Sequence, residues 1–501
     1  MVRNFRNLAT ASTLFASACI SAAAEGDFLK TDGQYLRNKS GLGDTVWLYG
    51  VNFGGLFVHE AWMSPLLGAL TEWDSRATLT SRFGAAQAQK LLDTYWDSWA
   101  TPADFKNIAA DGMNVVRMPV YFLDFMDDNG VWRKDASGAI DFARLDRLVN
   151  AAAKEGVYTL IDLHGAPGSQ NGDKHSGKTT GANLYTTPRY QTMLVDFWEK
   201  VAEHYKDHPA VAGYDLMNEP SQTFPGAMGQ NVVDLYDRCY QGIRAVDSNH
   251  IIWMEAIWAW NLLPDPKTKG WKNVAYSLHY YKWTENLDYN AMKGFIDAKV
   301  SDSKKWGAQY NVPHLGGEFS FFGNPQVWDY SMTKITQENW HWTIWSYKVT
   351  DNNSSWGLYT ANDAGPNKPN VATDSYDQIL KKWGSWNTAT YFKRNPMVGD
   401  AVKKAAGLRK AVRPIPVPVA PAALDRERSG FRVTGSLLQV EIPMDGIWTV
   451  KVEDIRGKVA LSLARQGRRF TVPTDGLAKG VYGITVGDGR RTWSGRVALQ
   501  R

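Results

Sequence analysis

The ten residues Val211-Ala-Gly-Tyr-Asp-Leu-Met-Asn-Glu-Pro220 join the end of a predicted strand to a carboxylate. Their apolar first half is typical of a strand buried on both faces, and Pro220 has no N–H to donate to a neighbouring strand. We therefore expect the strand to end beside Asn218 and Glu219, which leaves an amide and a carboxylate at its C-terminal end. In a barrel of parallel strands, catalytic side chains are placed at this end.

A second stretch, Pro313 to Phe319, has the same design, because Glu318 lies near the end of a short apolar run. A single glutamate at a strand end is most often an ordinary charge that faces solvent. Two glutamates in matching contexts instead predict a pair of carboxyl groups suited to cleaving a glycosidic bond, one as the acid and one as the nucleophile.

Strand-like and helical segments alternate along the chain on both sides of these stretches. Strands are predicted over residues 45–53, 114–120, 158–164, 211–219, 251–255, 274–281, 314–319 and 342–347. Apolar residues at helical spacing predict helices over residues 85–99, 102–111, 141–155, 188–205, 232–246, 289–306 and 326–339. Eight such alternations predict an α/β fold, the (β/α)₈ TIM barrel. The connection between the fifth and sixth strands is the least clearly helical.

The first 24 residues are typical of a targeting segment. Two arginines precede an apolar run that ends at Ala22-Ala23-Ala24, which predicts a secretory signal peptide cleaved after Ala24 and not a membrane span. A lipoprotein signal at Cys19 is the alternative, although Ala16 stands where such signals have a bulky aliphatic residue. Cleavage leaves Cys239 as the only cysteine, so the exported chain would have no internal disulfide.

Of the 501 residues, the barrel is expected to occupy 25–408, and a proline-dotted linker follows over 409–423. Residues 424–501 alternate apolar and polar residues between turns, which predicts a small C-terminal antiparallel β-sandwich. This part carries 14 Lys and Arg against 8 Asp and Glu, a net charge of +6, whereas residues 1–423 carry −1. Because the basic balance belongs to the tail, nucleic-acid binding by the barrel is not expected.

Polar and aromatic side chains recur at the predicted strand ends. Besides the two glutamates, they are Arg117, His164, Asn218, His279, Tyr281 and Trp345. A retaining glycosidase needs one protonated and one ionised carboxyl group about 5 to 5.5 Å apart. The permanent charge of Arg117 is suited to keep the nucleophile ionised. Each residue alone also fits a structural role, as an ion pair, a core histidine or a core tryptophan, but their joint occurrence favours a site. Glu255 ends the fifth strand and has no evident role.

This ordered set of residues resembles glycoside hydrolase family 5, the family of cellulases and related β-glucanases. The resemblance runs from about Val46 to Trp383, which is roughly the whole barrel. It rests on Arg117 in Met-Asn-Val-Val-Arg-Met-Pro, His164 in Ile-Asp-Leu-His-Gly, Asn218-Glu219-Pro220, His279-Tyr-Tyr281, Gly317-Glu318-Phe319 and Trp345.

The resemblance implies that Glu219 is the acid/base and Glu318 the nucleophile. It also implies that Asn218 holds the 2-hydroxyl of the bound sugar, that Tyr281 contacts the nucleophile and that Trp345 forms the floor of the subsite. The two histidines can donate to sugar hydroxyls or steer the carboxylates. Retention of the anomeric configuration follows, with no metal and no cofactor. The nine histidines lack the paired spacing of a catalytic metal site, which also argues against a metallohydrolase.

The bond that is cleaved stays open at this point. The stretch His164-Gly-Ala-Pro-Gly-Ser-Gln-Asn-Gly172 resembles a loop of the fungal exo-β-1,3-glucanase branch of the family, although ordinary turn chemistry also explains its Gly and Pro residues. We expect a retaining endo-β-1,4-glucanase, cellulase-like, with an exo-β-1,3-glucanase or glucosidase as the alternative. A non-catalytic glycan-binding barrel is a second alternative, which the acid pair disfavours because binding needs only the aromatic residues.

The C-terminal sandwich is expected to direct the protein to its place outside the cell or to hold it at the cell surface. Gly476 to Val486 resembles the end of C-terminal sandwich domains that secreted bacterial enzymes use for sorting or surface retention. A basic sandwich that touches acidic surfaces, or an inert cap, is the alternative. We therefore expect a monomer that is secreted or held at the cell surface, with a β-glucan as its substrate and the secretion machinery or the surface as its only other partner.

Overall fold

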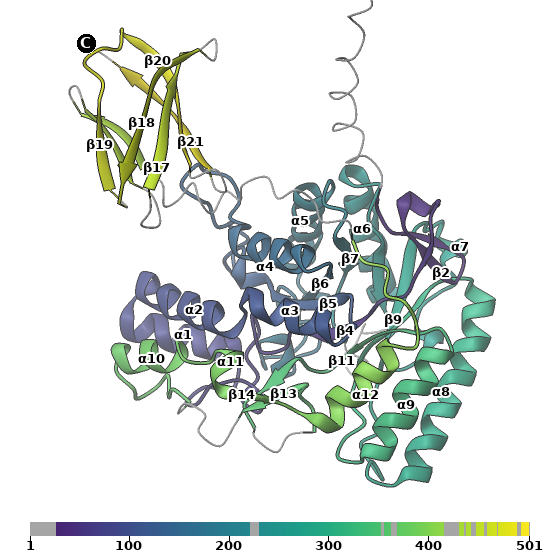
Figure 1. The fold of residues 1–501 in the computed structure, drawn as a ribbon. Helices are drawn as coiled ribbons and strands as arrows, with labels where there is room; N and C mark the ends of the chain where they lie inside the picture. The colour runs from purple at the N-terminus through teal and green to yellow at the C-terminus, as the bar shows by residue number, and fades with distance from the viewer. Residues whose placement is uncertain are drawn as a thin grey trace, which may run out of the picture. The chain divides into compact units, whose positions relative to one another are not determined.

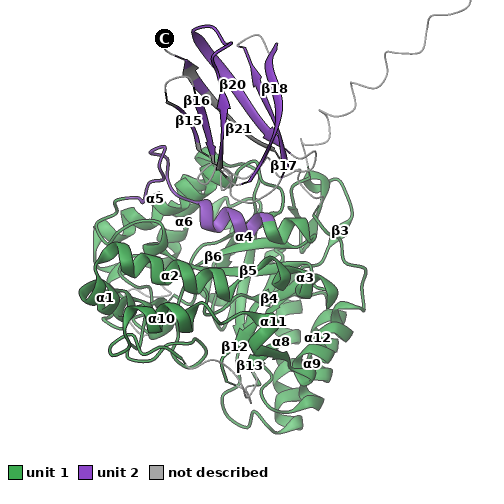
Figure 2. Ribbon diagram, turned by 60° about the vertical axis from the view of Figure 1, so that its left-hand side comes forward, with its two compact units in different colours: residues 1–131, 151–417 green, residues 132–150, 418–501 purple. Residues whose placement is uncertain are grey.

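The computed structural model describes residues 27–220, 230–351, 355–361 and 368–414 and, further on, 430–434, 437–441, 447–454, 458–467, 469–487 and 492–499. The chain divides into two compact units, one of residues 1–131 and 151–417 and one of residues 132–150 and 418–501 (Figure 2). The predicted signal peptide lies outside the described residues, as do residues 415–423 of the predicted linker.

The larger unit contains a closed barrel of eight parallel strands (Figure 1). In chain order these are β4 (Tyr49–Asn52), β5 (Val115–Tyr121), β6 (Tyr158–Gly165), β7 (Val211–Asp215), β8 (Ile252–Glu255), β9 (Val274–Tyr280), β10 (His314–Phe319) and β11 (His341–Ile344). Each strand pairs with the next, and the pair Trp342 and Tyr49 joins β11 to β4. The predicted (β/α)₈ barrel is therefore confirmed.

The barrel separates an apolar half from a polar half. Residues near the strand starts, among them Val115, Leu160, Trp253 and Leu315, form one buried apolar cluster. Strands β5, β6, β9 and β10 are buried along their whole length, as expected of parallel strands covered on both faces. The strand starts are packed with apolar side chains, and buried polar side chains lie near the strand ends. Barrel enzymes have their active sites at these ends.

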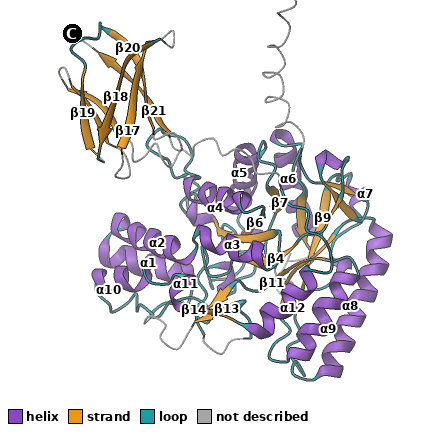
Figure 3. Ribbon diagram, in the orientation of Figure 1, coloured by secondary structure: helices purple, strands orange, loops and turns teal. Residues whose placement is uncertain are grey.

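Helices accompany the strands (Figure 3). They are α1 (Glu72–Phe83), α2 (Ala85–Trp99), α3 (Pro102–Ala110), α4 (Ala143–Lys154), α5 (Pro188–Tyr205), α6 (Gln230–Val246), α7 (Pro266–Lys269), α8 (Tyr289–Tyr310), α9 (Pro325–Gln337), α10 (Tyr376–Trp383), α11 (Thr388–Tyr391) and α12 (Pro396–Ala406). Helices α2 and α5 have the predicted bounds. The fifth connection is the least helical, since it holds only the short η5 (Trp260–Leu262) and α7. None of the helices in the described residues is long and apolar enough to cross a membrane.

Several predicted strands have different bounds. The eighth is β11, which ends at Ile344, so Trp345 follows the strand and does not lie in it. The stretch 45–53 is two strands, because β3 (Thr45–Val46) pairs with β2 (Tyr35–Arg37) in a small N-terminal sheet and only β4 enters the barrel. Strand β7 ends at Asp215 and not at Glu219. Beyond Asp215 the chain bends away, and Glu219 adopts a left-handed φ of 43°, a conformation that a strand cannot contain.

The sequence did not predict several short elements of this unit. They include β1 (Lys30–Asp32), the helices α1 and α10 to α12, and a sheet formed by β12 (Lys348–Val349), β13 (Tyr359–Ala361) and β14 (Phe392–Arg394). Strands of two or three residues show no period of their own, and their partners are remote in sequence, so pattern analysis does not find them.

The smaller unit contains two antiparallel sheets, which confirms the predicted C-terminal sandwich. One holds β15 (Gly430–Thr434), β16 (Leu437–Glu441) and β19 (Arg469–Pro473), and the other holds β18 (Val459–Gln466), β17 (Ile447–Glu453), β20 (Gly480–Gly487) and β21 (Thr492–Leu499). Leu438, Trp448, Val472 and Ile484 belong to one buried core that both sheets share. Strands β15 and β16 are neighbours in the chain and pair antiparallel.

Candidate active site

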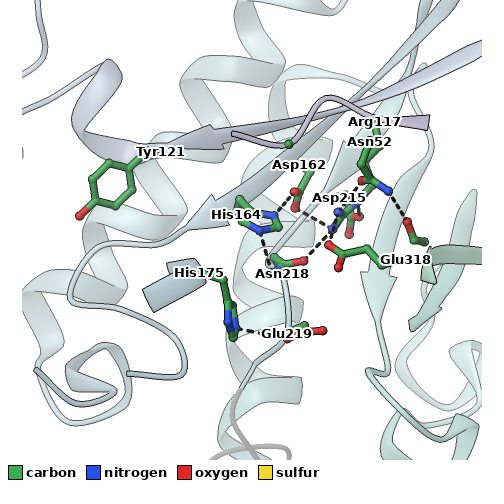
Figure 4. Close-up of polar contacts among 12 residues, drawn as sticks. Asn52, Arg117, Tyr121, Asp162, His164, His175, Asp215, Asn218, Glu219 and Glu318 are labelled. Atoms are coloured by element: carbon green, nitrogen blue, oxygen red, sulfur yellow. Dashed lines mark hydrogen bonds and ion pairs between the residues drawn. The ribbon is translucent and has the colours of Figure 1, made fainter. Parts of the chain in front are cut away.

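The side chains singled out from the sequence converge at the C-terminal ends of the barrel strands, and Figure 4 shows Arg117, His164, Asn218, Glu219 and Glu318 among them. Arg117 lies in β5, His164 in β6, His279 in β9 and Glu318 in β10, while Tyr281 and Trp345 directly follow β9 and β11, and Asn218 and Glu219 lie a few residues after β7. Six of them line one cavity of about 520 Å³: His164, Asn218, Glu219, Tyr281, Glu318 and Trp345. Arg117 and His279 are buried and contact these residues.

The fully buried guanidinium of Arg117 links the barrel strands below the cavity. It contacts five side chains at 2.8 to 3.0 Å, which are Asn52, Asp162, Asp215, Asn218 and Glu318. Arg117 was predicted to lie beside the candidate nucleophile Glu318, and its Nη1 donates to Oε1 of Glu318. A single rigid group therefore fixes both Glu318 and the amide of Asn218.

Arg117 is shared among several acids, which the sequence did not reveal. Burial raises the pKa of Asp162 to about 7 and that of Asp215 to about 6, although Arg117 lowers both. Burial likewise raises the pKa of Glu255 well above its ordinary value. The carboxyl groups near Arg117 thus outnumber its charge, so some of them hold protons at neutral pH.

Glu318 has donors on both carboxyl oxygens. Arg117 holds Oε1, and the Tyr281 hydroxyl donates to Oε2 over 3.1 Å. Nδ1 of His279 lies 3.5 Å from the same Oε2. The side chain is 6% exposed. Burial raises the pKa of Glu318 to about 7, while His279 and Arg117 lower it and the charge of Glu219 adds to the rise.

Glu219 is held by groups from three other strands or loops. Its Oε1 lies 2.7 Å from Nδ1 of His279, and its Oε2 lies 3.2 Å from Nε2 of His175. Its backbone N–H donates to Oε2 of Glu255 and its backbone carbonyl accepts from Nδ2 of Asn171, over 2.9 and 3.0 Å. These two bonds secure the left-handed backbone at Glu219, which costs about 1 kcal/mol for a residue other than glycine.

The two glutamates face each other. One carboxyl oxygen of each, together with a ring nitrogen of His279, lies within 4.8 Å of the others. Burial would raise the pKa of Glu219, but the hydrogen bond from His279 and the charges of His175 and His279 lower it to about 2. Because like charges this close resist joint ionisation, the two pKa values belong to the pair. The pair therefore holds one proton between about pH 2 and pH 7.

His164, Asn218 and Trp345 contact one another, and His164 is held by Asp162. Nδ1 of His164 lies 2.7 Å from Oδ2 of Asp162, and burial lowers the pKa of His164 well below its ordinary value, so the ring is neutral and donates through Nδ1. Its Nε2 then faces Nδ2 of Asn218 at 3.4 Å. The rings of His164 and Trp345 are stacked, with centroids 5.2 Å apart and an interplanar angle of 10°. The indole of Trp345 lines the cavity.

The cavity is lined by aromatic and by titratable side chains. The aromatic residues are Trp62, Trp258, Tyr281, Trp283, Trp345 and Trp356, and the charged or titratable residues besides the sequence-predicted ones are Glu60, Asp173, Lys174 and His175. Trp283 is 63% exposed, and its ring stacks on Tyr281 at 5.3 Å. Flat rings and a few polar groups are the usual composition of a sugar-binding cleft.

Several of these residues escaped the sequence analysis. Glu255, which had no evident role, supports Glu219 and lies 3.4 Å from Nε2 of His279. Glu60 and Trp62 come from the loop after β4, where the Trp62 indole donates to Oε2 of Glu60 over 2.9 Å. For Asp162 and Glu255, the only feature of the sequence that could have indicated a role in the site is their location at or near the end of a strand. A lone acid or tryptophan in a loop gives no such signal.

A closed barrel with two facing carboxyl groups and an aromatic cavity at its strand ends defines a glycoside hydrolase. The cellulase model of glycosyl hydrolase family 5 matches residues 81–362, more than half of the chain, and the chain belongs to this family.

Relatives within this group carry different names. A beta-xylosidase of Phanerodontia chrysosporium is 31% identical over 51% of this chain and 52% of its own length, and a glucan 1,3-beta-glucosidase of Pichia angusta is 29% identical over 62% and 71%. The chain thus spans about half the length of the first of them. A rutinosidase structure from Aspergillus niger is similar with a TM-score of 0.51 at 17% identity, over 68% of this chain and 98% of that one. This likeness concerns the fold alone.

Proposed function

We propose that this glycoside hydrolase cleaves β-1,3-glucosidic bonds of glucans with retention of configuration, using Glu318 as the nucleophile and Glu219 as the acid/base. The observation that carries the proposal is the spacing of the two carboxyl groups within 4.8 Å. Retaining enzymes keep these groups about 5 to 5.5 Å apart, whereas inverting enzymes leave about 6.5 to 9.5 Å for a water molecule. The spacing leaves no room for that water.

The division of roles follows from the partners of each carboxyl group. Glu318 receives hydrogen bonds from Arg117, which is always charged, and from Tyr281, and both favour its ionised form. The partners of Glu219 are histidines. In the free site these histidines lower the pKa of Glu219 while burial raises that of Glu318, so the proposed roles require the proton of the pair to pass to Glu219 for the reaction.

The proposed reaction has two displacements. In the first, a carboxylate oxygen of Glu318 bonds to the anomeric carbon while the bond to the glycosidic oxygen breaks, and Glu219 gives its proton to that oxygen. In the second, Glu219 takes a proton from water, the water oxygen bonds to the anomeric carbon, and Glu318 is released as a carboxylate. Each step inverts the anomeric carbon, so the product keeps the β configuration.

Activity is expected to follow a bell-shaped pH profile. Above about pH 7 the pair loses its single proton, so no acid remains and kcat/KM falls. At pH values below the lowered pKa of Glu219 both carboxyl groups are protonated, so no nucleophile remains. Initial rates on an aryl β-glucoside from pH 3 to 10 test this, and a rate that keeps rising above pH 8 would contradict the assignment.

The preference for β-1,3 bonds has two supports. The Pichia angusta relative and probable glucan 1,3-beta-glucosidases of Aspergillus fumigatus and Aspergillus niger are 29% to 30% identical to this chain. The loop from His164 to Gly172 also takes part in the site, since Gln170 donates to the carbonyls of His164 and Asn218 and Asn171 to that of Glu219. The cellulase-like endo-β-1,4 activity expected from the sequence stays a prediction and is the competing candidate.

Product analysis on a panel of substrates separates these candidates. We expect glucose from laminarin, with a kcat/KM at least about 10-fold above that on carboxymethyl cellulose, because the site must discriminate linkage geometry. Paired aryl β-glucoside and β-xyloside substrates test the sugar itself. A rapid fall in the viscosity of carboxymethyl cellulose would favour the endo-β-1,4 reading, and binding without any released sugar would favour the non-catalytic barrel.

Location is proposed from the sequence alone. Residues 1–24 would direct export and be removed, and the C-terminal sandwich would act in sorting or surface retention. Both proposals leave the catalytic barrel as the part that recognises the glucan.

A further inference from the structure

We propose that His175 is a positioning residue that orients the acid/base Glu219. The inference rests on the proposed role of Glu219 and goes beyond it, because His175 belongs to a loop and to no strand end. It lies in η3 (Lys174–Ser176), in the connection that follows β6. Figure 4 shows its ring directed at Glu219.

Two histidines contact Glu219, and they differ in the carboxyl oxygen that they contact and in their burial. His279 holds Oε1 from β9 and is fully buried, whereas His175 holds Oε2 at 3.2 Å and its side chain is 23% exposed. The carboxyl group is thereby fixed at both oxygens. Of the two histidines, only His175 is partly exposed to solvent.

Asn171 sets the protonation of His175. Its Oδ1 accepts from the backbone N–H of Asp173, so its Nδ2 group faces Nε2 of His175 at 2.6 Å and the carbonyl of Glu219. An Asn N–H directed at Nε2 requires a lone pair there, so the neutral ring carries its proton on Nδ1. The neutral ring then offers Nε2 as an acceptor next to the acid proton of Glu219. The charged ring instead places an N–H against both Asn171 and Glu219.

The charges around His175 come from several segments. Asp173 and Lys174 lie on its own loop, with Oδ2 of Asp173 4.0 Å from Nδ1. Glu60 approaches from the loop after β4, where burial raises its pKa and the charge of His175 lowers it. His164 and Glu219 face it from the barrel, and a charge on His175 lowers the pKa of each. Protonation of His175 therefore favours the ionised form of Glu219, which cannot act as an acid.

Two variants of the full-length chain separate positioning from a purely structural effect. For His175→Gln, kcat/KM on a glucoside with a poor phenol leaving group should fall about 10- to 100-fold, a part of the about 10² to 10⁴ that a general acid contributes. On the 2,4-dinitrophenyl glucoside, which needs no acid, the change should stay below about 2-fold. His175→Asn should recover part of the loss.

Matched controls make each failure distinct. His204→Gln changes an exposed histidine on α5 and should leave both substrates unaffected. Glu219→Ala, measured in parallel, tests the acid role itself. An equal loss on both substrates for His175→Gln would overturn the role of His175 while Glu219→Ala still depends on the leaving group. If Glu219→Ala shows no such dependence, the proposed function fails first.

Discussion

Replacing Glu318 by Gln is expected to abolish turnover and to leave the barrel folded. The amide has nearly the same shape but no nucleophilic oxygen, so kcat/KM on an aryl β-glucoside should fall by at least about 10⁴-fold. The amide oxygen can still accept from Arg117, and the Tyr281 hydroxyl, which can also accept, can turn to face the new NH2 group. Steady-state rates and a thermal unfolding curve measure the two effects separately.

The control for this variant is Glu203→Gln, a glutamate with a half-exposed side chain on α5. It should leave the rate and the melting temperature unchanged within error, because an exposed charge contributes little to stability. Turnover by Glu318→Gln within about 10-fold of the parent would remove Glu318 from the role of nucleophile. A lost unfolding transition would instead mean that the loss of rate reflects misfolding.

Replacing Glu219 by Ala is the second large effect, and its size should depend on the leaving group. A sugar or phenol that departs poorly needs a proton, so its kcat/KM should fall by about 10² to 10⁴. A dinitrophenolate departs without one, so that substrate should form the glycosyl-enzyme at close to the parent rate. The measurement is kcat/KM for a series of aryl glucosides plotted against the pKa of the leaving phenol.

The second half of the reaction gives an independent readout for Glu219→Ala. Without the base, the glycosyl-enzyme accumulates, and added azide, which needs no base, should raise kcat and yield β-glucosyl azide. Absence of rescue together with a flat leaving-group plot would exclude Glu219 as the acid/base. Its place in the left-handed turn would then be structural, maintained by Glu255 and Asn171.

The barrel could be predicted because its elements repeat. Buried parallel strands are apolar runs, and the helices between them carry regular apolar spacing, so eight alternations give one answer. The predicted strand bounds were least reliable beside the candidate site. The strand predicted to reach Glu219 ends at Asp215, because the backbone turns at Glu219, and the apolar pattern of the sequence does not indicate this turn. Strands β12 to β14 are too short to show a period.

The site was predictable where function and strand ends coincide. Glu219, Glu318 and Arg117 each close or interrupt an apolar run, and the barrel brings such positions together. Glu60, Trp62 and His175 lie in loops, so their approach to Glu219 depends on the path of each loop and not on a local pattern. The sharing of Arg117 among Asp162, Asp215 and Glu318 is likewise a property of the closed barrel, visible only once the strands are in register.

The central claim is that Glu318 bonds to the sugar while Glu219 faces it. Incubation with 2,4-dinitrophenyl 2-deoxy-2-fluoro-β-glucoside should trap that bond, because the fluorine slows both displacements while the good leaving group keeps the first fast enough for the glycosyl-enzyme to accumulate. Peptide mapping by mass spectrometry should then find one fluoroglucosyl group per chain, on the peptide that contains Glu318. A label on any other residue, or full inactivation without a covalent label, would contradict the account.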